Sequence, residues 1–308
     1  MHPHTMTDYA SARTPGQKFP KRPALRPRTQ RGITLIELMV GIAIGLLVIA
    51  VAMGALMVSR GVSGTVSDAS NIQQQASSVM RVIGQQLRQA GSLRLNLDPG
   101  IVTTPAPYMA PVAFETTVAP SAGTLESFDP ATHTLSGTTS PVSLTAGYRR
   151  FTESVFTSAL PQAISRNCQG GPADTSTDGR VENIFQLNGT DLRCSGNGAA
   201  PQAIAQNVAN FQVRYLLQDT TTSPGIPTIK SVDATGVGTN WGRVQAVEVC
   251  VVLFGTEPIG MDAGSTYTDC DGSAVDMSTL TGARARRMHM AFRNVFQLRS
   301  QGLVGSVL

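Results

Sequence analysis

The most apolar stretch of the chain covers residues 33–58, in which Glu37 is the one charged residue. Built as a helix that rises about 1.5 Å per residue, this stretch is about 39 Å long, whereas the hydrocarbon core of a bilayer is about 30 Å thick. The pattern therefore predicts the membrane-spanning half of an N-terminal helix.

The next stretch, residues 59–92, changes from uniformly apolar to amphipathic, with apolar residues every three or four positions. We expect one helix from Ile33 to about Ala90, ended by Gly91, because glycine most easily adopts a left-handed cap. Its apolar stripe should pack on the following domain; a coiled coil is the alternative, although the charge pattern that specifies one is missing. The stripe contains Val62, Val66, Ala69, Ile72, Ala76, Val79, Ile83, Leu87 and Ala90, and the polar face contains Gln73, Gln74, Arg81, Gln85 and Arg88.

Residues 93–308 are rich in Thr, Ser, Pro, Gly and β-branched residues, which predicts one β-rich globular domain with long loops. The clearest hairpin is 183–194, where Asn188-Gly189 is the dipeptide favoured in a type I′ turn. Together with the helix, this composition indicates the α+β class. Further strands are expected at Phe211–Tyr215, Val244–Phe254 and Met288–Leu298, and exposed loops at Thr220–Asn240 and Thr256–Ser278.

The charge is distributed unevenly along the chain. Its net charge is +4, but residues 1–32 hold seven basic residues against Asp8, which leaves 17 basic and 19 acidic residues, net −2, in residues 33–308. The basic character is thus a property of residues 1–32, and it gives no argument for a nucleic-acid-binding domain. We interpret residues 1–32 as a cytoplasmic leader, and the positive-inside rule then places the C-terminus outside the inner membrane.

Four cysteines follow the predicted membrane span, and none has the spacing of a metal site. An even number in an exported domain favours disulfides, for which three connectivities exist. Pairing neighbours along the sequence gives Cys168–Cys194 and Cys250–Cys270, which close loops that each contribute about 3–4 kcal/mol in the chain-entropy treatment.

Candidate catalytic residues are few. Of the four histidines, only His133 and His289 lie outside residues 1–32. No hydrolase, zinc-protease or phosphate-loop motif occurs in the sequence. We therefore expect a protein without catalytic activity, cofactor or metal ion. A group of arginines forms a candidate basic face for DNA or an acidic partner, but a solvated strand face is the more common explanation and no interleaved aromatic residues strengthen the DNA case, so nucleic-acid binding stays open. The group comprises Arg284, Arg286, Arg287, Arg293 and Arg299, with Arg149 and Arg150 as further members.

Glu37 is the most informative residue of the apolar stretch. A carboxylate in a membrane helix costs up to about 2.5–3.5 kcal/mol and persists with a partner and a function. Cutting the chain after Gly32 would create an α-amino group at Ile33 that pairs with Glu37 of a neighbouring copy. An ordinary secretory signal cut after residues 50–52 is the alternative, but its apolar region would be unusually long.

This junction resembles the class III signal of type IV prepilins, in which a basic leader ends in Gly and Glu occupies the fifth mature position. The resemblance implies cleavage after Gly32 by prepilin peptidase, N-methylation of Ile33 and an assembly role for Glu37. It also implies a type IV pilin-like fold. Ile33 departs from the usual Phe, but both residues are apolar.

Parts of the C-terminal half are similar to PilW-type minor pilins: 183–215, the cysteine-bearing strand 243–254 and the terminal 286–299. The resemblance implies a minor pilin that helps initiate type IV pilus assembly and lies at or near the pilus tip. It would act in adhesion and twitching motility, moving from the inner membrane to the extracellular pilus. Implied partners are other minor pilins, the major pilin, prepilin peptidase, the inner-membrane assembly platform and a tip adhesin. A minor pseudopilin of a type II secretion system and a singly anchored periplasmic binding protein are the alternatives.

Overall fold

The computed structural model of the chain describes residues 32–91, 95–96, 113–114, 128–159, 161–173, 176–219 and 228–299. The chain divides into two compact units, and the division falls between Leu56 and Met57. The predicted leader, apart from Gly32, lies outside the described residues.

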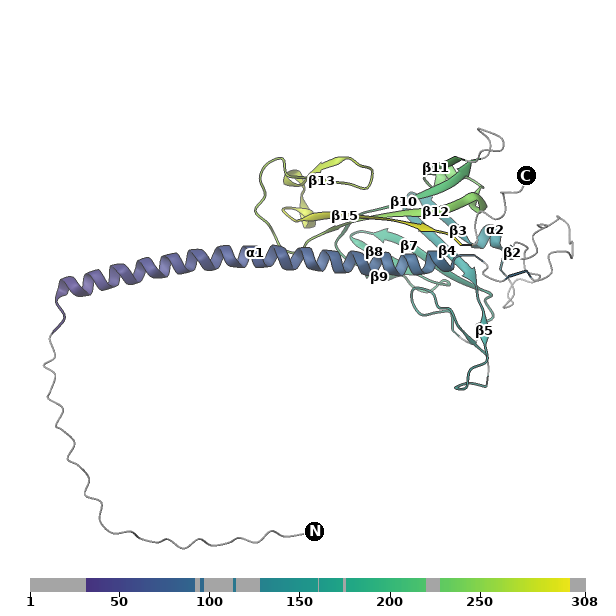
Figure 1. Cartoon of the computed structure of the whole chain (residues 1–308), viewed down its shortest axis with the longest axis horizontal. Helices are drawn as coiled ribbons and strands as arrows, with labels where there is room; N and C mark the ends of the chain where they lie inside the picture. The colour runs from purple at the N-terminus through teal and green to yellow at the C-terminus, as the bar shows by residue number, and fades with distance from the viewer. Residues whose placement is uncertain are drawn as a thin grey trace, which may run out of the picture. The chain divides into compact units, whose positions relative to one another are not determined.

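The first element of the described residues is one long helix, α1 (Leu35–Gln89) (Figure 1). Its bounds agree with the helix expected from Ile33 to about Ala90. Leu35–Met57 has the length and the mean hydropathy, 2.7, of a membrane span, and none of its most apolar window is buried within the protein. The first part of α1 therefore has the character that the apolar pattern predicts.

The second part of α1 packs through its apolar stripe from Ile72 onward. Ile83, Leu87 and Ala90 are fully buried, while the expected polar face is exposed. The predicted apolar stripe begins too early in the sequence, because Val66 is 65% exposed. Asp68 is buried instead, so the packed surface begins with a carboxylate that periodicity alone did not identify.

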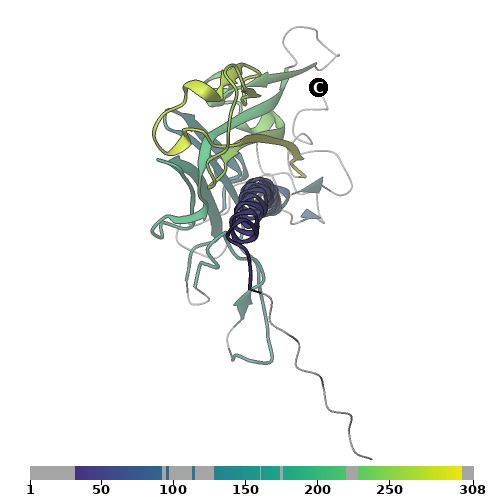
Figure 2. The same ribbon diagram turned by 90° about the vertical axis from the view of Figure 1, so that its left-hand side faces the viewer.

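Two antiparallel sheets form the body of the domain, and α1, the first sheet and the second sheet contribute to one hydrophobic core (Figures 1 and 2). The first sheet has the strand order β3-β4-β7-β8-β9, and the second has the order β11-β10-β12-β15. Their bounds are β3 Leu135–Thr139, β4 Val142–Arg149, β7 Arg180–Asn188, β8 Asp191–Ser195, β9 Gln202–Ala205, β10 Val208–Asp219, β11 Thr228–Val232, β12 Val244–Phe254 and β15 His289–Gln297.

Shorter elements complete the described part of the domain. Three strand pairs lie outside the two main sheets: β1 (Leu95–Asn96) with β2 (Ala113–Phe114), β5 (Thr152–Glu153) with β6 (Gln162–Ala163), and β13 (Thr266–Thr268) with β14 (Ala274–Asp276). The short helices are α2 (Pro130–His133), α3 (Ala234–Val237), η1 (Trp241–Arg243), η2 (Met277–Thr279) and η3 (Gly282–Arg284). This arrangement of one long helix and antiparallel sheets is the expected α+β fold.

The β7–β8 hairpin exists, but its turn lies one residue later than Asn188-Gly189. Asn188 pairs with Asp191, so Gly189 and Thr190 are the two turn residues. Gly189 has a φ of 62° and Thr190 has no positive φ, which fits a type II′ turn with glycine first. The shift sets the register, and with it Leu192 and Cys194 are fully buried.

Both segments predicted as exposed loops contain structure. Within 220–240, β11 extends the second sheet and α3 buries Val237. Within 256–278, β13 and β14 form a hairpin that buries Tyr267 and Cys270. Turn-forming residues dominate both segments, so short strands and their long-range contacts were not evident in the local pattern.

The C-terminal end of α1 is joined to β4 by backbone hydrogen bonds. Gly91 has a φ of 94°, as a glycine helix stop requires. Its N–H donates to the Gly147 carbonyl (2.8 Å), and its carbonyl accepts from the Arg149 N–H (3.1 Å). One turn earlier, the Tyr148 hydroxyl donates to Gln86 Oε1 (2.9 Å). The helix stop is therefore also an attachment point.

Gly84 of α1 lies directly against Phe296 of β15, because a Cβ there would lie within 2.9 Å of Phe296 Cδ1, in a ring that is only 3% exposed. Gly64, on the same helix, has open space at its Cβ position. Gly84→Ala should lower the free energy of unfolding by about 1–3 kcal/mol through overpacking, less the roughly 1 kcal/mol that alanine gains in a helix.

The matched control, Gly64→Ala, should be neutral or stabilising. Urea unfolding of the full chain in detergent, followed by the fluorescence of the single tryptophan, Trp241, measures both variants. Equal effects of the two substitutions would contradict this account of the helix–sheet contact.

Candidate functional site

The N-terminal candidate site consists of Gly32, Ile33 and Glu37, all exposed. Thr34 caps α1, because its Oγ1 accepts from the Glu37 N–H (3.3 Å) and its carbonyl accepts from the Leu38 N–H (3.1 Å). Thr34 and Glu37 have the spacing of a capping box, and an acidic residue in the first turn also suits the helix dipole. The cap fixes the start of the helix two residues after Ile33, which leaves the Gly32–Ile33 peptide bond outside the helix.

The first half of α1 is a cylinder of exposed apolar side chains. Ile33, Leu35 and Met57 are each more than 70% exposed, and the intervening large apolar residues are all at least half exposed. Such a surface is stable only in lipid or against other apolar surfaces. Glu37 lies near one end of it, so its carboxylate is the charge that any neighbour packed there would meet.

Asp68 is an attachment residue that hydrophobic periodicity missed. It is 3% exposed, and its Oδ1 accepts from the backbone N–H (2.9 Å) and the hydroxyl (3.0 Å) of Thr256. Its Oδ2 has no hydrogen-bond partner among the described residues and lies against Gly255, where a Cβ would clash. The burial of Asp68 could not be predicted from the helix sequence, because it depends on the contact with Thr256, which is distant in the sequence.

The structure contains both sequence-neighbour disulfides, Cys168–Cys194 and Cys250–Cys270. The first joins the segment before β7 to β8. The second joins β12 to the β13–β14 hairpin, and Cys250, Val252, Tyr267 and Cys270 form a separate small core there. Each disulfide therefore attaches a segment outside the main sheets to a strand of one of them: the segment before β7 to β8, and the β13–β14 hairpin to β12.

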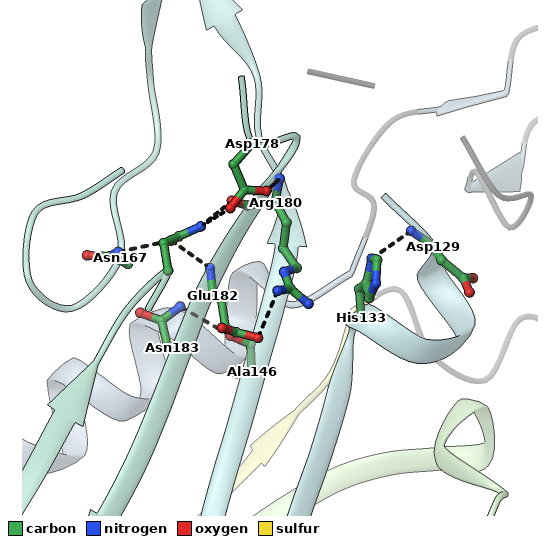
Figure 3. Close-up of polar contacts among 9 residues, drawn as sticks. Asp129, His133, Ala146, Asn167, Asp178, Arg180, Glu182 and Asn183 are labelled. Carbon is green, nitrogen blue, oxygen red and sulfur yellow. Dashed lines mark hydrogen bonds and ion pairs between the residues drawn. The ribbon is translucent and has the colours of Figure 1, made fainter. Parts of the chain in front are cut away.

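A network of side-chain amides holds the segment around Cys168 (Figure 3). The fully buried Asn183 accepts from the Cys168 N–H (2.7 Å) and donates to the Ala146 carbonyl (3.2 Å). Asn197, at a φ of 51°, donates to Asp178 Oδ2 (2.7 Å) and accepts from Asn167 Nδ2 (3.0 Å). These bonds satisfy polar groups that the loop would otherwise bury, so the network stabilises the fold of this segment.

The expected basic face is not one surface. Arg149 and Arg150 are 4% and 2% exposed, and Arg150 donates to the carbonyls of Ser176 (2.6 Å) and Ala173 (2.8 Å). Arg149 ends β4 of the first sheet and Arg150 follows it, so both are apart from the C-terminal group along the chain. Within that group, Arg293 pairs with Glu248 (3.0 Å). Periodicity could not separate surface from buried arginines because buried carbonyl acceptors leave no local sequence signal.

His289 and His133 both serve the fold. The His289 ring is stacked between Tyr267 and Phe254, at centroid distances of 4.8 and 5.7 Å. Its Nε2 accepts from Arg284 Nε (3.2 Å), and Nδ1 donates to the Arg287 carbonyl (2.9 Å) in the matching neutral tautomer. Burial, and secondarily the Arg284 charge, lower the pKa of His289 below 6.5. Burial and Arg180 lower the pKa of His133 in the same way (Figure 3).

Within the described ranges, no group of three or more His, Cys, Asp or Glu side chains is arranged to hold a metal ion. The chemistry that the geometry does offer is at the N-terminus: an accessible peptide bond, an apolar helix and one carboxylate.

Residues 27–53 match the family model described as "Prokaryotic N-terminal methylation motif". Together with the apolar helix and the sheet-rich domain, this motif supports the class of type IV pilin-like proteins. A search of curated proteins finds no match. Among solved structures, the type IV-like pilin TTHA1219 from Thermus thermophilus is 12% identical, with 74% of this chain and 95% of that chain covered; its TM-score of 0.36 is too low to support a shared fold.

Residues 174–300, which include β7 to β12 and β15, match the family described as "Type IV Pilus-assembly protein W". The two family matches support a type IV pilus minor pilin of the PilW family. The motif and the apolar helix fit a pilin that is anchored in the inner membrane and later incorporated into the pilus.

The lowered pKa of His289 predicts acid-sensitive stability. Below pH 6.5 the unfolded chain binds a proton that the folded ring accepts only at lower pH, so the free energy of unfolding falls with pH until the folded pKa is passed. His289→Phe keeps an aromatic ring in the stack but cannot titrate, so it should flatten this dependence between pH 7 and pH 5.

His133→Gln is the control, because it should remove only the separate contribution of His133. Urea unfolding of the full chain in detergent at pH 5, 6 and 7 compares the slopes. An unchanged slope in His289→Phe would show that other groups cause the acid sensitivity.

Proposed function

We propose that this chain is a minor pilin that helps initiate pilus assembly and occupies a position at or near the fibre tip. The observation that carries the proposal is the exposed apolar half of α1 with Glu37 at its start. This surface suits the membrane before assembly and the packed centre of a fibre afterwards. The description of the matching family as a pilus-assembly protein favours a pilus over a type II secretion system.

The first step of the proposed pathway is processing. Prepilin peptidase cuts between Gly32 and Ile33 and methylates the new Ile33 amine. The cap at Thr34 supports this assignment, because it holds the helix start beyond the scissile bond and leaves that bond in extended, exposed chain. An enzyme needs such accessible backbone at its cleavage site.

The second step is entry into the fibre. The positive amine at Ile33 of one subunit pairs with Glu37 of its neighbour, while the apolar sides of their helices pack together. In that low-dielectric setting each charge requires the other, because breaking a buried pair by removing one partner costs about 3–5 kcal/mol. The pair thereby sets the axial register between neighbours as well as their attraction.

The proposed partners follow from this pathway. Prepilin peptidase and the inner-membrane assembly platform act on the membrane-anchored chain, and other minor pilins and the major pilin pack against its helix. A subunit at the tip would also present its β-rich domain to a tip adhesin. Membership of the PilW family supports these assignments.

Processing predicts a defined N-terminus. Intact-mass analysis and N-terminal sequencing of the full protein purified from pilus-producing membranes should find N-methylated Ile33. Gly32→Glu should leave the leader attached, since a carboxylate replaces the small residue before the cleavage site. An N-terminus near Met53 would instead indicate an ordinary signal peptidase and overturn the pilin pathway.

Glu37→Gln tests assembly separately from insertion. The variant should be cleaved and retained in the membrane at wild-type levels, because an amide is no harder to bury than a carboxylate. It should be depleted roughly tenfold or more from sheared fibres, since the neighbour's amine loses its counter-charge. Quantitative immunoblots of membrane and fibre fractions measure this.

Glu37→Asp is the matched control, because it keeps the charge and shortens the side chain by one methylene. It should enter fibres better than Glu37→Gln. Equal incorporation of all three proteins would mean that the charge pair does not drive entry of this subunit.

A further inference from the structure

β15 is the edge strand of the second sheet within the described residues. Two bonds fix which of its backbone groups face β12: the Gly255 N–H donates to the Met288 carbonyl (2.8 Å), and the Leu298 N–H donates to the Gln245 carbonyl (3.0 Å). Even-numbered positions therefore bond inward along this antiparallel ladder, and odd-numbered positions point their N–H and C=O groups outward. Val295 agrees, because its N–H is turned to the Asn294 side chain (2.9 Å).

The outward edge is long enough to pair with another strand. Ala291, Arg293, Val295 and Gln297 supply its outward groups, and all four residues are exposed. An edge of this kind is a template for strand addition unless something blocks it. The strand contains neither proline nor a register shift in its pairing with β12.

A groove of about 570 Å³ lies beside this edge, between β15 and the second half of α1. Figures 1 and 2 both show β15 beside that part of the helix. Met80 of α1 and the largely buried Phe296 of β15 are apolar lining residues, and Arg81, Arg88 and Arg299 supply charge. None of the described lining residues is acidic, so the groove favours an anionic occupant.

A second hollow of about 470 Å³ continues along the polar face of α1. It shares Ser77 and Arg81 with the first, and its other lining residues are Ser and Gln. The two hollows together form a polar track along the helix, next to the strand edge at one end. This shape suits an extended chain better than a compact ligand.

We propose that β15 and this groove bind an extended acidic segment of a neighbouring pilin subunit, which adds to the second sheet as a further strand. The added strand would lie about 4.8 Å from β15 and bond to its odd-numbered backbone groups. Its alternate side chains face α1, where carboxylates meet Arg81 and Arg88. The inference rests on the proposed function, because it takes another fibre subunit as the partner.

Nucleic acid fits the same charges less well. Single strands bind through bases stacked on exposed aromatic rings, and the aromatic ring of this groove, Phe296, is 3% exposed. The outward groups of β15 alternate between N–H and C=O, which matches the edge of another strand, whereas a phosphate chain offers acceptors alone.

A photo-activated cross-linking residue in place of Gln85 tests the occupant in the full chain, within cells that make pili. Gln85 is exposed and lines the groove. The expected product is an adduct with a second pilin, identified by mass spectrometry of its peptides, in which the linked segment is acidic and extended. Adducts within the same chain, with nucleic acid or with a protein that is not a pilin overturn the proposal.

Two variants separate strand addition from general proximity. Val295→Pro removes an outward N–H and leaves the β12 ladder bonds in place. Arg81→Glu with Arg88→Glu reverses the groove charge. Each should lower the adduct yield roughly tenfold or more, the effect of losing one or two interface bonds.

Val295→Thr and Arg286→Glu are the matched controls, the second reversing an exposed arginine outside the groove. Both should keep the adduct, and mapping of the two disulfides checks the fold of every variant. An adduct yield that is the same in all variants overturns the proposal. Absence of the unmodified chain from sheared fibres would instead count against the proposed function, so the two failures are distinguishable.

Discussion

The exposed apolar surface of the first half of α1 is the constraint on which the rest of the molecule depends. A helix with no buried face over Leu35–Met57 requires lipid or other helices around it. The same helix continues to Gln89, so the domain is built directly onto the element that needs those surroundings. The globular domain must therefore form its core without covering the apolar surface of the first half of α1.

The domain meets this constraint by using only the second half of α1. There the stripe from Ile72 to Ala90 closes one core under strands of both sheets. Phe296 packs against Gly84 of α1. Tyr148 donates a hydrogen bond to Gln86, and Thr256 donates to Asp68. The domain thus binds α1 through apolar packing, a hydrogen bond between side chains and a buried carboxylate.

The sequence was most informative where a strong physical requirement acts locally. Helix α1, its end at Gly91 and the strands β12 and β15 follow from hydrophobic length, period and glycine geometry. The turn at Gly189-Thr190 was misplaced by one residue because two turn types compete for the same glycine. Elements β11, β13 and β14 were missed because their burial comes from long-range partners.

The candidate site divides in the same way. The predicted processing signal at Gly32, Ile33 and Glu37 could be proposed from the sequence because it consists of fixed residue types at short, fixed spacings, and cleavage after Gly32 stays a prediction. The groove beside β15 could not be predicted from the sequence, since Arg81 and Arg299 lie far apart along the chain. In addition, no characteristic residue composition marks a strand as the edge of its sheet. The burial of Arg149 and Arg150 was hidden for a related reason: backbone carbonyls are acceptors at every position.

The contacts of α1 with the domain also have a mechanical consequence. They are spread along the helix, from Asp68 through Gly84 and Gln86 to Gly91. A pull along the helix axis acts on all of them at once, in shear, so that no single bond carries the whole load. If the domain contacted α1 only at its last turn, tension would break the contacts one after another. With the contacts spread along the helix, they share the load and must break together.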